Sequence, residues 1–532
     1  MSSNNSRITK KILASVSATA VFAEESIAKV RAYLGRVEKG QPSIYTAPFA
    51  KGTDIDEVLA DWDKVLVSIR DKWPSLYQFE KDLAKKVGPL SVMKPIRERM
   101  NDIRSYYEDI LLSSQPINEG AIAKVVDEFA AIRGLRPRSA WNTVLKMKKS
   151  TNSGAPLFMK RREVVYSTLN LLKSILWHST PGPRSLGKCL MAVVGWRGQE
   201  GGPSEEDVKQ RVVWMFPFVI NVAELQVYQP LIEACQTANL VPAWVSMESV
   251  DERITALFDT KASDDLVVCT DFSRFDQHFN LDMQSASKSI LSAVLTPSPE
   301  SRNWLRNVFP VKYNIPLVVR YDDAKNSIVY ARGPHGMGSG SGGTNADETL
   351  AHRALQYEAA IVHGKDLNPN SQCLGDDGIL SYPGITVEDV VATYSSHGQE
   401  CNPDKQYAST QDCVYLRRWH HKDYRKDGVC VGVYSTNRAI GRLRYLERYM
   451  DPEVWGPEAV ALRQLSIIEN CKWHPLREEF AEFCMKRDKY RLGIDIPGFL
   501  DNITEIALKY TDYMEDFLGY TKTLQGEGPE GI

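Results

Sequence analysis

Two adjacent carboxylates, Asp376 and Asp377, stand between apolar residues in the segment 373–380. An Asp-Gly pair flanked by apolar residues is typical of a β-hairpin. Two negative charges held side by side at a hairpin tip repel each other unless a cation neutralises them. The pair is therefore a candidate site for a divalent metal ion. The alternative is an ordinary hairpin, because Asp is also favoured in turns.

Another carboxylate pair lies earlier in the chain, at Asp271 and Asp276. Asp271 follows the short apolar run 266–269, which predicts a buried strand, and Asp276 is expected to begin a helix. A carboxylate at the end of that strand can meet the hairpin tip on a neighbouring strand. Three converging carboxylates fit a pair of magnesium ions that clamp the attacking and leaving oxygens of a phosphoryl or nucleotidyl transfer.

A glycine-rich loop lies between these two segments, with six glycines in the eleven residues 333–343. Such a loop cannot form a stable helix or strand. Thr344 is predicted to begin a helix that runs to about Val362 and ends at Gly364, with Asp347 in a capping-box arrangement. A small-residue loop before a helix lets the backbone approach a phosphate or a nucleic-acid strand. The alternative is a flexible linker.

The order of these segments resembles motifs A, B and C of viral RNA-dependent RNA polymerases. The matching patterns are D-x4-D at 271–276, S-G-x3-T at 339–344 and G-D-D at 375–377. Further segments resemble motif G (150–156), motif F (209–213), the lysine of motif D (Lys405) and the motif E hairpin (415–418). The resemblance spans about residues 150 to 420, and the motif B version S-G-S-G-G-T-N-A-D-E-T is most similar to that of picobirnaviruses, which have segmented double-stranded RNA genomes.

The resemblance implies an α+β right-hand fold with fingers, a palm made of an antiparallel sheet backed by helices, and a helical thumb. The corresponding ranges are an N-terminal extension (1–60), fingers (61–235 and 295–335), palm (236–294 and 336–425), and thumb with a C-terminal tail (426–532).

The resemblance also implies an activity, which is template-directed RNA synthesis without a primer for replication and transcription of a viral double-stranded RNA genome. The implied catalytic residues are Asp271, Asp376 and Asp377, as ligands of two Mg²⁺ ions that Mn²⁺ can replace, and Lys405, which protonates the pyrophosphate. The implied nucleotide-binding residues are Lys209, Arg211, Asp276, Ser339, Thr344 and Asn345, and the implied RNA-binding residues are Ser153, Gly154, Lys160, Arg161, Gly340, Arg417 and Arg418.

The chain departs from the family at one position of motif B. Many members have an Asn four residues after the motif B threonine, where this chain has Glu348, and its Asn is Asn345. The family pairs that Asn with the second motif A aspartate to recognise the ribose 2′-OH, which both donates and accepts hydrogen bonds. The resemblance assigns the role of that aspartate in recognising the 2′-OH to Asp276. Its partner is either Asn345 or Ser339.

Charge and cysteine content favour an intracellular protein that binds RNA. The net charge is −2, but nine basic residues and no acidic residue lie between Arg133 and Arg162, a segment that can neutralise phosphates. The alternative is a solvated basic surface. Nine unclustered cysteines predict reduced thiols. The resemblance adds the virion interior and host cytoplasm as locations, and RNA, ribonucleoside triphosphates and a capsid protein as partners, with no membrane.

Two local patterns point elsewhere and are not adopted. Residues 182–189 nearly match a phosphate-binding P-loop, but Cys189 lacks the hydroxyl that binds magnesium. The apolar run 12–23 is too short to span a bilayer. Its spacing of Ile8, Ile12 and Val16 predicts an amphipathic helix.

Two other functions compete with RNA synthesis. A reverse transcriptase shares the palm, but it needs a bulky side chain at the position of Asp276 to exclude the 2′-OH. A non-catalytic RNA-binding core protein would have a decayed active site, whereas Asp271, Asp376 and Asp377 are all present.

Overall fold

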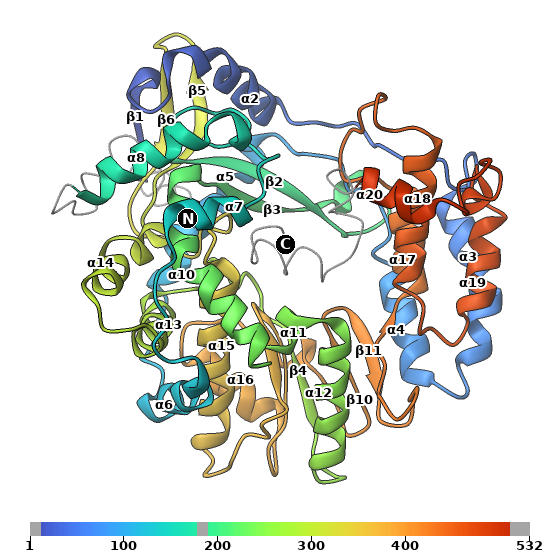
Figure 1. The fold of residues 1–532 in the computed structure, drawn as a ribbon. Helices are drawn as coiled ribbons and strands as arrows, with labels where there is room; N and C mark the ends of the chain where they lie inside the picture. Colours follow the sequence, from blue (N-terminus) through green and yellow to red (C-terminus); the bar gives the residue numbers. More distant parts are fainter. Residues whose placement is uncertain (1–11, 178–189, 511–532) are drawn as a thin grey trace, which may run out of the picture.

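The computed structural model describes residues 12–177 and 190–510. The P-loop-like run and the end of the C-terminal tail lie outside these residues. Helices and three separate sheets form the described chain, which confirms the α+β prediction. In Figure 1 the sheet with β4 lies at the bottom, the sheet with β2 and β3 runs from the upper left to the centre, and the C-terminal helices lie at the right.

The palm sheet has four strands in the order β7-β8-β4-β9, and every neighbouring pair is antiparallel. The strands are β4 (Val267–Thr270), β7 (Gln372–Leu374), β8 (Asp377–Leu380) and β9 (Tyr407–Ser409). The strand and the hairpin predicted from sequence are thus confirmed to within one residue. All four residues of β4 are buried, as expected of an apolar β-branched strand at the centre of a sheet.

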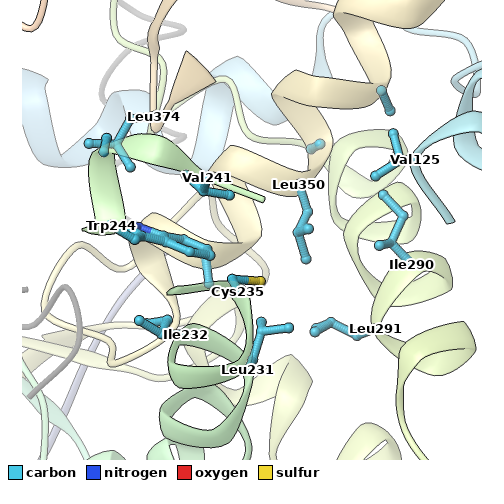
Figure 2. Close-up of a cluster of buried hydrophobic side chains, with 14 of the residues drawn as sticks. Val125, Leu231, Ile232, Cys235, Val241, Trp244, Ile290, Leu291, Leu350 and Leu374 are labelled. Atoms are coloured by element: carbon cyan, nitrogen blue, oxygen red, sulfur yellow. The ribbon is translucent and has the colours of Figure 1, made fainter. Parts of the chain in front are cut away.

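Helices cover the palm sheet and form the largest hydrophobic core of the described chain. They are α6 (Glu119–Glu128), α13 (Leu281–Val294), α15 (Thr344–Ile361) and α16 (Val387–Ser395). In Figure 2, Leu350 of α15 lies between Val125 of α6 and Leu231 of α10 (Phe218–Thr237), and Trp244 lies below Leu374 at the end of β7. This packing fixes the end of β7, and therefore the hairpin tip that follows it.

Helix α15 begins at Thr344 and ends next to Val362, as predicted, but the predicted capping box is wrong. The N-cap residue is Gly343 and no side chain caps the helix. Asp347 is fully buried and accepts hydrogen bonds from the hydroxyls of Tyr228 and Tyr313, each at 2.6 Å. The buried ammonium group of Lys312 lies 3.0 Å from the same carboxylate. Asp347 therefore anchors the first turn of α15 in the core.

The fingers contain a five-stranded sheet in the order β1-β6-β5-β2-β3. Its strands are β1 (Leu13–Ser17), β2 (Ala192–Gln199), β3 (Lys209–Met215), β5 (Leu317–Asp322) and β6 (Ser327–Ala331). Alternate residues face two cores, so that Val193 and Val318 pack with α2 (Ile27–Lys39) while Val194 and Val319 pack with α5 (Ile96–Glu108).

Within the described residues the predicted N-terminal helix is wrong, because residues 13–17 form strand β1, while Ile8 lies outside the described residues. This strand pairs with β6 along its whole length, from Leu13 opposite Ala331 to Ser17 opposite Ser327. The exposed edge of β6 supplies backbone hydrogen bonds that a short isolated helix lacks. Tertiary pairing therefore overrides the four-residue spacing of the apolar side chains.

The thumb helices are α17 (Thr436–Arg444), α18 (Pro457–Glu469), α19 (Arg477–Met485) and α20 (Ile503–Lys509). Two N-terminal helices, α3 (Ile55–Leu66) and α4 (Pro74–Ala84), share a core with α17, α18 and α19. The buried carboxylate of Glu80 on α4 accepts hydrogen bonds from the first backbone amides of α17. Residues 61–84, which were predicted to belong to the fingers, therefore pack with the thumb.

The remaining elements connect these parts. They are α7 (Ala140–Lys146), α8 (Val165–Trp177), α10 (Phe218–Thr237), α11 (Pro242–Val245), α12 (Met247–Thr260), α14 (Pro299–Asn307), and the strands β10 (Asp412–Tyr415), β11 (Arg418–His421) and β12 (Val433–Tyr434) of the third sheet. None of the helices in the described ranges has the length and apolar character needed to cross a bilayer.

Candidate active site

The palm sheet brings the predicted carboxylates to one end. Thr270 pairs with Gly378, so Asp271 leaves β4 beside Asp377, the first residue of β8. Leu374 pairs with Asp377, which leaves Gly375 and Asp376 as a two-residue turn. Gly375 has φ 57°, a left-handed conformation that glycine adopts without strain. Asp376 is solvent-accessible at the tip of this turn, next to Asp377.

Desolvation raises the pKa of all three carboxyl groups, and repulsion from neighbouring carboxylates raises it further at Asp376 and Asp377. Partial desolvation is the main cause for Asp376, whose pKa is raised further by Asp276 and Asp271 and lowered by Arg211. Burial and then Asp376 raise the pKa of Asp377 to about 7. The pKa of Asp271 is also raised by desolvation. The nearby positive charges of the chain do not balance these carboxylates.

The donor set suits a hard divalent cation, because Mg²⁺ prefers carboxylate oxygens and accessible positions that keep its waters. Within the described ranges, no three Asp, Glu, His or Cys side chains are already gathered as a metal cluster. The carboxylate of Asp377 accepts a 2.8 Å hydrogen bond from the amide of Leu416. Asp271 and Asp376 are the two accessible carboxylates, so these residues fit the role of metal ligands.

Gln406 was not identified from the sequence, yet it holds the backbone of Asp271. The side-chain oxygen of Gln406 accepts from the Asp271 amide at 2.7 Å, and its amide nitrogen donates to the Asp271 carbonyl at 2.8 Å. The same nitrogen donates to the carbonyl of Asn402 at 2.9 Å. These bonds tie the end of β4 to the turn that carries Lys405. A lone Gln before a short strand gives no recognisable sequence signal.

Two exposed lysines lie close enough to Asp271 to lower its pKa. They are Lys405, at the end of the 3₁₀ turn Pro403–Lys405, and Lys86, which follows helix α4. The structure therefore places Lys405 beside the carboxylates, as expected. Lys86 was not among the predicted site residues, because its segment shows no motif and reaches the site only through the packing of α4 on the thumb.

Asp276 lies in a turn before α13, so the predicted helix start at Asp276 is wrong; Asn280 caps the helix instead. The guanidinium of Arg211 lies 3.3 Å from the Asp276 carboxylate. This contact raises the pKa of Arg211. Lys209, two residues earlier on β3, is exposed.

The partner of Asp276 on helix α15 is Glu348, not the expected Asn345 or Ser339. The side chains of Glu348 and Asp276 are hydrogen bonded, and both are buried. Burial, followed by the charge of Asp276, raises the pKa of Glu348 well above its ordinary value. Asn345 instead accepts from the indole of Trp244 at 2.8 Å, and Ser339 donates to the carbonyl of Val212 at 2.9 Å.

The glycine loop packs against β3 and α10 rather than lying free. A side chain at Gly340 would overlap the carbonyl of Trp214, so only glycine allows this approach. The buried carboxylate of Glu224 on α10 accepts from the Ser341 hydroxyl and from the amide of Gly342. The hydroxyl of Thr344 donates to the carbonyl of Gly338 at 3.2 Å and so stabilises the loop. The flexible-linker alternative is therefore wrong.

Four of the predicted RNA-binding residues have structural roles. The guanidinium of Arg418 is held by both carboxylate oxygens of Asp251, at 2.9 and 3.0 Å. Arg161 is buried against Phe218 and donates to Asn221 at 3.0 Å. Two further positions, Ser153 and Gly154, are buried against the start of α10. These side chains are not available to RNA in this conformation.

Lys160 and Arg417 remain exposed, and their contact with RNA stays a prediction. Leu416 and Arg417 form the turn of the β10–β11 hairpin with φ 52° and 62°, an unusual conformation for side chains other than glycine. The amide of Leu416 in this turn holds Asp377. Backbone strain at this turn thus coincides with a contact to the carboxylate cluster.

Comparison with known proteins gives one consistent family. The family model of viral RNA-dependent RNA polymerase matches residues 104–448. A protein named potential RNA-dependent RNA polymerase of human picobirnavirus (strain Human/Thailand/Hy005102/-) is 58% identical over 502 residues, which cover 94% of this chain and 92% of the relative.

Two crystal structures of the RNA-dependent RNA polymerase of a human picobirnavirus are also similar. The insertion-loop deletion mutant is 54% identical with a TM-score of 0.87, and covers 96% of this chain and 98% of its own. The other structure is 53% identical with the same TM-score and coverage.

The Gln406 clamp predicts a local change in amide exchange. In Gln406→Ala, the Asp271 amide loses its acceptor, and we expect its hydrogen exchange to accelerate about 2- to 10-fold, the effect of one hydrogen bond. Mass spectrometry of peptides covering 267–276 measures the change. Gln411→Ala, an exposed position after β9, is the control and should leave these peptides unchanged. Equal exchange in wild type and Gln406→Ala would contradict the clamp.

Proposed function

The chain belongs to the viral RNA-dependent RNA polymerases, and from this membership we propose that it joins ribonucleotides by two-metal nucleotidyl transfer at Asp271 and Asp376. The observation that supports this mechanism is the pairing of β4 with β8, which sets Asp271 beside the β7–β8 turn. When bound, two magnesium ions would lower the pKa of the attacking 3′-OH and neutralise charge on the triphosphate.

In the proposed reaction, the 3′ oxygen of the growing strand forms a bond to the α-phosphorus of the incoming ribonucleotide. The bond between the α-phosphorus and the bridging oxygen breaks, and pyrophosphate leaves. The 3′-OH releases its proton to solvent water, and Lys405 gives a proton to the pyrophosphate. Its exposed position beside Asp271 supports this role. An ordinary surface lysine would be equally exposed. Kinetic measurements on a Lys405 variant therefore distinguish a proton donor from a surface lysine.

Arg211 is the second basic group of the proposed mechanism. It holds Asp276 in the structure and can form a bidentate contact with a phosphate. We propose that the incoming triphosphate takes Arg211 from Asp276. That exchange frees the Asp276 carboxylate for the ribose. Lys209, exposed at the start of the same strand, would contact the outer phosphates.

Ribose selection would fall to Asp276 and Glu348. A carboxylate and a protonated carboxyl group together accept and donate, as the 2′-OH requires. One oxygen of Glu348, Oε1, is buried and has no hydrogen-bond partner among the described residues. The residue that replaces the family's usual Asn can therefore perform the recognition that the Asn performs elsewhere.

The two competing functions receive less support. The relatives are named as RNA-dependent polymerases, and the Asp276 side chain would not exclude a 2′-OH as reverse transcription requires. The intact carboxylates argue against a decayed site. The family resemblance extends the proposal in three respects. They are initiation without a primer, replication of a double-stranded genome, and a capsid-associated position in the virion and host cytoplasm.

Loss of one metal ligand should abolish synthesis without unfolding the protein. In Asp376→Asn we expect ribonucleotide incorporation to fall more than about 100-fold, because residues that only orient a metal ligand already cost 10- to 100-fold. Incorporation of labelled ribonucleotides on an RNA template with magnesium measures it. Asp366→Asn, at an exposed position after α15, is the control. Wild-type synthesis by Asp376→Asn, or preference for deoxynucleotides by the wild type, would reject the proposal.

Truncation of Glu348 should weaken ribose selection. In Glu348→Ala we expect the preference for ribonucleotides over deoxynucleotides to fall about 2- to 10-fold, the range for one hydrogen bond to a neutral group. Single-turnover incorporation of ATP and dATP measures the ratio. Asn345→Ala is the matched variant and should keep the wild-type ratio. If Asn345→Ala loses selectivity and Glu348→Ala keeps it, the usual family pairing holds and our assignment fails.

A further inference from the structure

An exposed aromatic pair lies on α7 and α8, outside the carboxylate site. Trp141 is 46% exposed and Tyr166 is 75% exposed. Their rings are stacked, with centroids 6.2 Å apart and an angle of 26° between the planes. By contrast, the stacked rings of Phe279 and Tyr313 are buried in the core. Burial therefore does not explain the Trp141–Tyr166 pair.

The chain segment that carries this pair is basic. Glu163 is the only acidic residue from 133 to 177. Part of the basic segment is already neutralised, because Arg138 and Lys146 both form ion pairs with Glu233. Exposed basic side chains remain on both sides of Tyr166 along the chain, at Lys160, Arg162 and Lys173. Flat rings next to separated cations suit an anionic partner that has planar groups.

The segment between the two helices connects the pair to the glycine loop. Buried Arg161 donates to Asn221 on α10, and Asn221 in turn donates to the carbonyl of Gly340 at 3.2 Å. The carbonyl of Ser153 accepts from the amide of Phe218 at 2.8 Å. These contacts fix residues 148–162 between the aromatic pair and the loop. The segment between the two aromatic residues is therefore anchored to the loop that precedes α15.

We propose that Trp141 and Tyr166 form a stacking platform for the bases of single-stranded RNA template outside the carboxylate site. Aromatic side chains stack with any base, while basic groups bind the phosphates, which gives binding without sequence preference. The proposal rests on the template-directed synthesis proposed above. A protein partner is the competing occupant, and it would also use the exposed apolar side chain of Leu145, one turn after Trp141.

The test measures RNA affinity by fluorescence anisotropy with labelled single-stranded oligoribonucleotides of increasing length. We expect the double variant Trp141→Ala/Tyr166→Ala to bind the longer oligonucleotides about 10- to 100-fold more weakly, which is the effect of losing one or two stacked bases. The double variant Trp141→Phe/Tyr166→Phe should retain affinity because it keeps the rings. Leu145→Ala should bind as wild type. Unchanged affinity in the alanine double variant overturns the platform, and so does an equal loss in Leu145→Ala, because the loss would then not depend on the aromatic rings.

Two further measurements separate this proposal from the proposed function and from misfolding. Thermal unfolding of the alanine double variant should match wild type, because both side chains are exposed. Its RNA synthesis on a template too short to reach the platform should also match wild type, and a loss there would overturn the assignment. If the wild type makes no RNA, the proposed function fails. The comparison of RNA affinity between the wild type and the alanine double variant still tests whether the two rings bind RNA.

Discussion

Repulsion between carboxylates at one end of the palm sheet is the constraint on which the site depends. Asp271, Asp376 and Asp377 are brought together by strand pairing and a two-residue turn, and each has a raised pKa. Such an arrangement is unfavourable unless a bound cation, a proton or a donor offsets the charge. The fold must therefore supply enough rigidity to hold the charges in place.

Three contacts supply that rigidity from different parts of the chain. The strained β10–β11 turn donates an amide to Asp377, Gln406 holds the backbone of Asp271, and the core around Leu350 fixes the end of β7. On the opposite side, β3 brings Arg211 to Asp276. Fingers, palm and thumb-side hairpin thus meet at the carboxylates, and none of these contacts is local in sequence.

The elements with strong local patterns could be predicted from the sequence. The β4 strand, the β7–β8 hairpin and helix α15 lie where apolar runs, Asp-Gly and the glycine loop indicated. The predictions failed where contacts with residues far away in the sequence determine the local structure. Residues 13–17 became a strand through pairing with β6, and Asp347 turned into the core to meet two tyrosines.

The same limit applies to the side chains of the site. Motifs located the carboxylates and Arg211, but Gln406, Lys86 and Glu224 reach the site through folding alone and match no motif. Arg161 and Arg418 have the charge expected of RNA contacts, yet Asn221 and Asp251 bind them inside the protein. Glu348 takes the place expected for Asn345 because helix α15 turns it, and not Asn345, toward Asp276.

Metal-directed cleavage tests the central claim that Asp271 and Asp376 share bound cations. Fe²⁺ bound in place of magnesium, with ascorbate and peroxide, generates radicals that cut the backbone next to the ion. We predict cuts near both residues 271 and 376, and we predict that excess magnesium or the Asp376→Asn substitution suppresses them together. Cuts at only one of these segments, or cuts near 376 that persist in Asp376→Asn, would contradict the shared site.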